Sequence, residues 1–226
     1  MVSKVQERIY AETAIKLLEV DWQLIDIPEP LDFEVRSHGN TFGLEIRQVF
    51  ADTEQDFGSP AKRQESRNSR VVVDLAKRYY AIGGKPISAK FLGPVLSIKP
   101  DSFAEALAAT APSYPGEGKV EQFQGVKVFM NPLPLDWGSY SRWVCVDDRV
   151  GWLKQPTDAE LQEAVDRKHG NLPLYKQKYE DIDLLLVADR SFNSGKLYGV
   201  ENLCVCNPGF RTVYFLSYPE SIQCIG

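Results

Sequence analysis

Two carboxylates near the N-terminus, Asp32 and Glu45, have the types and spacing of a hydrolytic metal site. They flank His38-Gly39-Asn40, which suits a tight turn between two strands, and Arg47 follows Glu45 by two positions. Carboxylates on adjacent strands bind Mg²⁺ or Mn²⁺, which prefer oxygen ligands and keep several waters, and one such water becomes a nucleophile for phosphodiester hydrolysis. The pair therefore predicts metal-assisted hydrolysis at this hairpin.

The register of the two strands decides whether this site exists. We expect strands at residues 31–37 and 41–50, in which alternate side chains point to opposite faces. If the faces that carry Asp32 and Glu45 point the same way, two carboxylates and Arg47 converge. The alternative is that Asp32 ends a turn and Glu45 pairs across the strands with an arginine, as exposed hairpins often do.

A third carboxylate comes from the first expected helix, which runs from Ser3 to about Val20. Its apolar and small residues gather on one face, and these are Tyr10, Ala11, Ala14, Ile15, Leu17 and Leu18. At about 100° per residue, Glu7 falls in the middle of that face and Glu12 falls opposite. Because an isolated buried charge is costly, Glu7 is expected to need a partner or a metal.

A long helix is expected from Pro60 to about Ala81, after a polar loop. A basic stripe with i, i+4, i+7 spacing lies near its start and consists of Arg63, Arg67 and Arg70. This stripe would suit contact with a nucleic-acid backbone. The alternative is a solvated helix face, because acidic residues interrupt the same helix.

The rest of the chain alternates strand and helix patterns, which is typical of a mixed α/β sheet with parallel crossovers. Further strands are expected at 22–27, 87–92, 95–98, 126–130, 143–146, 182–188, 203–206 and 212–217, with helices at 101–109 and 158–167. The stretch from Thr110 to Lys119 has loop composition. We nevertheless expect one domain over 1–226, with a core at 1–110 and a strand-rich extension of the same sheet at 120–226.

The composition of the chain bears on its cellular location and partners more than on the reaction that it could catalyse. The chain has 226 residues and a net charge of −5, which argues against a surface that is a nucleic-acid platform throughout but allows a local basic patch. No apolar run approaches the roughly 18 residues of a membrane span, and no signal segment is evident, so a cytoplasmic protein without a membrane partner is expected. The four cysteines fit neither a zinc ribbon nor a disulfide framework, and Cys204 and Cys206 are expected to be buried thiols.

The run PLDFEVRSHGNTFGLEIRQVF resembles the core of PD-(D/E)xK nucleases of the restriction-endonuclease-like fold. Its matching positions are Pro30-Leu31-Asp32 and Glu45-Ile46-Arg47. The expected order of a helix, three strands, a helix and a strand is also similar to that family, over roughly the first 95 residues. The resemblance implies an α/β fold with a mixed central sheet that is flanked by helices.

The same resemblance implies roles for individual residues. Asp32 and Glu45 would bind Mg²⁺ or Mn²⁺, with Glu7 and the carbonyl of Ile46 as additional ligands. Arg47 stands where the family has lysine; it stays protonated and cannot act as a base, although it can clamp a phosphate and stabilise developing charge. In some relatives the following helix supplies the missing lysine, and Lys62 is the residue here in that position.

We therefore expect a metal-dependent nuclease that acts on DNA, and a homodimer is compatible with the resemblance. A second hypothesis keeps the fold without the chemistry, as an inactive module that binds nucleic acid or a protein partner. A third is a plain structural α/β protein. In that case Glu7, Asp32 and Glu45 do not converge.

Overall fold

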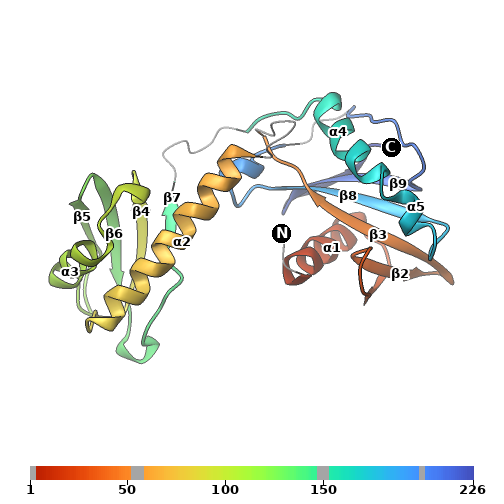
Figure 1. Cartoon of the computed structure of the whole chain (residues 1–226). Helices are drawn as coiled ribbons and strands as arrows, with labels where there is room; N and C mark the ends of the chain where they lie inside the picture. The colour runs from red at the N-terminus through yellow and green to blue at the C-terminus, as the bar shows by residue number, and fades with distance from the viewer. Residues whose placement is uncertain (1–3, 52–58, 147–152, 199–201) are drawn as a thin grey trace. The chain divides into compact units, whose positions relative to one another are not determined.

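The described residues form two compact units. The computed structural model describes residues 4–51, 59–146, 153–198 and 202–226 (Figure 1). Unit 1 comprises Met1–Pro60 and Trp152–Gly226, and unit 2 comprises Ala61–Gly151. The expected division between 110 and 120 does not coincide with these boundaries, because the last strands of the chain join the sheet of the first strands while the middle of the chain builds its own sheet.

Unit 1 is built on a six-stranded mixed sheet with the order β1-β2-β3-β8-β9-β10. Its strands are β1 (Gln23–Asp26), β2 (Phe33–Ser37), β3 (Asn40–Gln48), β8 (Ile182–Asp189), β9 (Thr212–Tyr218) and β10 (Ser221–Cys224). The first three form an antiparallel meander, β8 and β9 continue it in parallel pairing, and β10 pairs antiparallel with β9. The expected α/β class is therefore present, and the strands expected at 182–188 and 212–217 extend the first sheet. Those expected at 126–130 and 143–146 do not, because they belong to the sheet of the second unit.

Helices cover both faces of this sheet (Figure 1). Helix α1 (Lys4–Leu18) packs on one face, and α4 (Asp158–His169) and the short α5 (Leu172–Tyr175) pack on the other. Strand β8 is buried along its whole length, with Leu185 in the cluster beneath α1 and Leu184 in the cluster beneath α4. A strand that is buried on both faces reads as a continuous apolar run, which explains the sequence LLLVA.

A buried polar network ties α1 to the centre of the sheet. The hydroxyl of Tyr10 donates a hydrogen bond to Oδ2 of Asp189 at 2.6 Å, and Nε2 of Gln48 donates to the same hydroxyl at 2.5 Å. The backbone of Asp189 also lies directly against Gly195, which belongs to the 3₁₀ turn η3 (Asn193–Gly195). The end of β8 is therefore fixed from three directions.

Unit 2 has its own four-stranded sheet with the order β5-β6-β4-β7. Its elements are α2 (Pro60–Ala81), β4 (Ile87–Leu92), η1 (Val95–Ser97), α3 (Pro100–Thr110), β5 (Lys119–Phe123), β6 (Val126–Pro132), η2 (Leu135–Trp137) and β7 (Val144–Val146). A separate core unites the apolar face of α2 with this sheet, and it includes Leu75, Phe91 and Phe103. None of the described helices is long and apolar enough to cross a membrane.

Three local expectations are wrong. No strand forms at 95–98: Val95–Ser97 is a 3₁₀ turn, because the segment is enclosed by Pro94 and Pro100, which lack a backbone N–H for a ladder. Residues 203–206 form no strand, because the backbone N–H groups of Cys204 and Cys206 donate hydrogen bonds to the side chains of Asp158 and Gln162 in α4. Both thiols are consequently exposed rather than buried.

Replacing Gly195 by Ala is expected to destabilise the native state by about 2 kcal/mol or more, because the new Cβ would lie 2.1 Å from the carbonyl oxygen of Asp189. Chemical denaturation measures this change. Gly170→Ala is the matched control, since a Cβ at Gly170 meets nothing within 4 Å. Equal stability of the two variants would contradict the proposed packing at the end of β8.

Candidate metal centre

The pairing of β2 with β3 places Asp32 opposite Glu45. Phe33 pairs with Leu44 in the antiparallel register, so the next step along both chains brings the two acidic residues together. The backbone N–H of Ile46 donates a hydrogen bond of 2.8 Å to Oδ2 of Asp32, which holds that carboxylate against β3. The two carboxylates that were singled out from the sequence therefore lie side by side.

Glu45 is the most unusual acid in this group because it is only 3% exposed. Its Oε1 atom contacts Nζ of Lys168, whereas its buried Oε2 atom has no hydrogen-bond partner among the described residues. Burial and then the negative charge of Asp32 raise the pKa of Glu45 to about 7, although Lys168 and the Tyr175 hydroxyl act in the opposite direction. The deprotonated carboxylate is thus compensated by Lys168 and by the nearby Tyr175 hydroxyl, while its Oε2 atom forms no direct hydrogen bond within the described residues.

Glu7 and Lys4 approach the pair from α1. Nζ of Lys4 lies 2.9 Å from Oδ1 of Asp32 and 3.5 Å from Oε2 of Glu7. The side chain of Glu7 is 14% exposed, so it points inward from its helix. Burial and the charge of Asp32 raise the pKa of Glu7. The structure therefore brings Glu7 near Asp32, with Lys4 as their shared cation.

Lys168 was not found by sequence reasoning. It lies near the end of α4, 123 positions from Glu45, so no local spacing connects the two residues. The signal that could have found it is the apolar run of β8, because a strand that pairs parallel with β3 requires a crossover helix just before it. Lys62, which the resemblance offers as the replacement lysine, belongs to α2 in unit 2.

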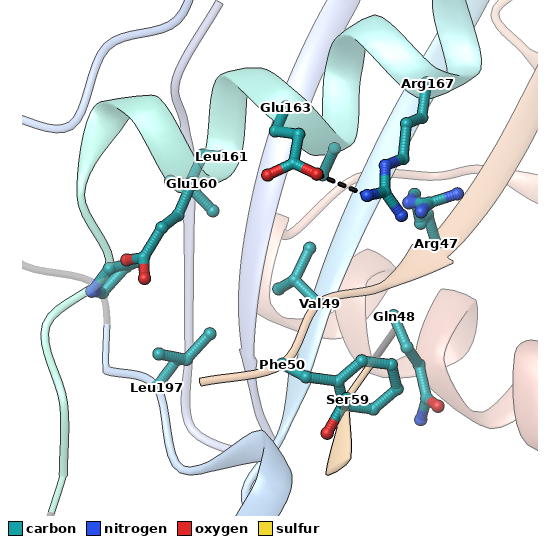
Figure 2. Close-up of a pocket in the computed structure, with 12 residues that line it drawn as sticks. Arg47, Gln48, Val49, Phe50, Ser59, Glu160, Leu161, Glu163, Arg167 and Leu197 are labelled. Atoms are coloured by element: carbon teal, nitrogen blue, oxygen red, sulfur yellow. Dashed lines mark hydrogen bonds and ion pairs between the residues drawn. The ribbon is translucent and has the colours of Figure 1, made fainter. Parts of the chain in front are cut away.

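Arg47 continues the face of Glu45 along β3 and lines a cavity of about 110 Å³ (Figure 2). The guanidinium groups of Arg47 and Arg167 lie side by side there, and Nη2 of Arg167 pairs with Oε1 of Glu163 at 2.5 Å. Burial and the charge of Arg167 lower the pKa of Arg47. The motif arginine therefore faces this cavity next to the carboxylates.

The basic stripe lies on the exposed side of α2, in unit 2. Arg63, Arg67 and Arg70 are all exposed, whereas the buried face of the same helix begins only at Val72. The amphipathic pattern of α2 thus separates its charged start from its apolar second half.

Oxygen donors for a divalent cation are present, but they are few. Within the described part of the chain, no group of three or more His, Cys, Asp or Glu side chains forms a metal cluster. The candidate donors are the carboxylates of Asp32 and Glu45 and the carbonyl of Ile46, which faces the β2 edge of β3 because the N–H and C=O of one strand residue face the same neighbouring strand. The unpartnered Oε2 of Glu45 fits a cation, since a cation would supply its missing partner.

The free energy of unfolding of the metal-free protein is expected to fall as the pH rises from 4.5 to about 7. In this window folded Glu45 retains a proton that the unfolded chain has released, so the folded state binds more protons and loses stability as pH increases. The contribution of Glu45 is on the order of 3 kcal/mol over the window, and Glu7 adds a slope of the same sign.

Urea denaturation at a series of pH values, with chelator present, measures this slope. Glu45→Gln should flatten most of it, whereas the exposed control Glu12→Gln should leave it unchanged. A wild-type slope in Glu45→Gln would show that Glu45 titrates normally.

Comparison with known proteins identifies no relative. The chain matches no protein-family model, no curated protein and no solved structure. A function for this chain therefore rests on its own side chains and their geometry.

Proposed function

We propose that this chain is a metal-dependent nuclease that hydrolyses phosphodiester bonds in DNA, with Asp32 and Glu45 as ligands of Mg²⁺ or Mn²⁺. The observation that carries the proposal is the buried Glu45, which lies opposite Asp32, contacts Lys168 and retains one oxygen without a described partner. Buried carboxylates of this kind are costly unless a cation compensates them. Groups with strongly shifted pKa values and a large burial cost are common at functional sites, where the compensating cation takes part in a reaction.

The order of the elements in unit 1 supports a restriction-endonuclease-like core. Helix α1, strands β1 to β3, helix α4 and strand β8 follow the order of a helix, three strands, a helix and a strand. The resemblance in the sequence assigned the last two places to the helix and strand at 60–81 and 87–92. Those two elements belong to unit 2, which interrupts the core as an insertion between β3 and α4.

Each residue of the site has a separate task in this proposal. The carboxylates of Asp32 and Glu45 and the carbonyl of Ile46 would hold the cation, and Glu7 would act through Asp32. A bound divalent cation would polarise a phosphoryl oxygen and lower the pKa of a bound water. Lys168 would stabilise the negative charge that develops when water attacks phosphorus and the bond to the leaving oxygen breaks.

The distribution of charge favours a nucleic acid as the substrate. Unit 2 carries 13 Lys and Arg against 9 Asp and Glu, a formal net charge of +4, while unit 1 carries −9. Unit 2 therefore has a positive net charge, although the net charge of the whole chain is negative. Its exposed stripe of Arg63, Arg67 and Arg70 would contact the phosphate backbone, a contact that weakens as salt increases.

The second candidate function is an inactive module of the same fold that binds nucleic acid or a protein partner. Two observations favour it. Arginine replaces the motif lysine at Arg47, and the ammonium groups of Lys4 and Lys168 already neutralise Asp32 and Glu45 without a metal. In this alternative the ion pairs are structural.

Glu45→Ala is expected to reduce Mg²⁺-dependent cleavage of DNA by at least about 100-fold while the protein remains folded, because the cation loses a ligand. Lys168→Met should cause a loss of similar order with metal binding intact. Rates of cleavage of labelled single- and double-stranded DNA measure these effects, with Glu12→Ala as the acidic control. Cleavage by Glu45→Ala at the wild-type rate, once contamination is excluded, would sink the nuclease assignment.

Calorimetric titration separates the active site from a vestigial one. Mn²⁺ is expected to bind one site, with an affinity that rises with pH up to about 7, because Glu45 must release its proton first. Asp32→Asn should abolish this binding. An absence of carboxylate-dependent heat at every pH would favour the inactive module instead.

A further inference from the structure

The cavity at Arg47 has features that the hydrolytic site does not use. It is bounded by β3 on one side and by α4 on the other, and its volume is about 110 Å³ (Figure 2). Arg47 and Arg167 present two guanidinium groups to it, while Val49, Leu161 and Leu197 line it with apolar surface. A guanidinium is a planar fork of donors that binds phosphate and carboxylate bidentately.

Arg47 differs from the other charged residues of this cavity in its ion pairing. Arg167 pairs with Glu163, and Glu160 contacts Lys154 and closes the capping box of α4. Within the described residues Arg47 forms no comparable ion pair, although it is half-buried beside a second arginine. Two adjacent cations repel each other, although the carboxylates of Glu163 and Glu45 attract Arg47 in the opposite sense. An anion between them would remove the repulsion.

The size and place of the cavity restrict the anion. A volume of about 110 Å³ corresponds to a few water molecules, so it is large enough for a phosphate group. Arg47 lies two residues after Glu45 on the same face of β3, which is a separation of about 7 Å along the strand. The cavity is therefore beside the carboxylates and does not overlap them.

We propose that the Arg47–Arg167 cavity binds a phosphate group of the substrate adjacent to the phosphate that is cleaved. This inference rests on the proposed nuclease function and names the subsite that aligns its substrate. The phosphate is either the terminal phosphate of a nucleic-acid end or an internal phosphodiester. Both present the same oxyanion to the two guanidinium groups.

Inorganic phosphate is the probe, titrated into metal-free protein at constant ionic strength and followed by calorimetry or by NMR of the arginine side chains. Arg47→Met is expected to weaken phosphate binding at least about tenfold, whereas Arg36→Met, which removes the same charge from β2, leaves it unchanged. Glu163→Gln should tighten binding several-fold, because it removes a carboxylate from the wall and releases Arg167.

The result that would overturn the inference is an absence of phosphate binding, or binding that Arg47→Met and Glu163→Gln do not change in opposite directions. Matched oligonucleotides with and without a 5′- or 3′-phosphate then distinguish the source. Tighter binding of a phosphorylated end identifies a terminal phosphate, and equal Arg47-dependent binding identifies an internal one.

The phosphate-binding experiment and the DNA-cleavage experiment can fail separately. If Glu45→Ala still cleaves DNA but Arg47→Met loses phosphate, the nuclease assignment fails and the anion site stands. If Glu45→Ala abolishes cleavage and phosphate does not bind, the subsite fails and the nuclease assignment stands.

Discussion

The burial of two carboxylates, one just before β2 and one within β3, is the constraint on which the rest of unit 1 depends. Asp32 is held by the N–H of Ile46 and by Lys4, and Glu45 by Lys168. Each of these contacts comes from a different element, so the sheet and both helix layers must be in place before the carboxylates are compensated. The same arrangement raises the pKa of Glu45 and leaves one of its oxygens without a described partner.

Strand β3 connects these requirements. Its even-numbered residues Phe42, Leu44 and Ile46 pack beneath α1, while Glu45 and Arg47 project toward α4. Pairing with β8 on one edge and β2 on the other fixes this alternation, because a slip of one residue would exchange the two faces. Charged side chains are therefore confined to one side of a strand whose other side stabilises the core.

Local patterns predicted the hairpin and the carboxylate pair because both depend on near neighbours and on alternation. They also predicted the inward direction of Glu7, which follows from the helical period. Lys168 and the association of β8 with β3 were not predicted, since they bring together residues more than 100 positions apart across an inserted unit. The helix and strand that follow the hairpin in sequence, α2 and β4, have patterns that suit the next two elements of the first sheet. However, β4 pairs with β6 and β7 in the sheet of unit 2.

A crystal structure of the protein with Mn²⁺, using anomalous scattering to locate the ion, tests the central claim most directly. We predict one anomalous peak bounded by the carboxylates of Asp32 and Glu45 and the carbonyl of Ile46, with Oε2 of Glu45 within coordination distance of about 2.0–2.3 Å. A structure at saturating Mn²⁺ with no peak at these oxygens, and with Lys4 and Lys168 still paired to the two carboxylates, would contradict it.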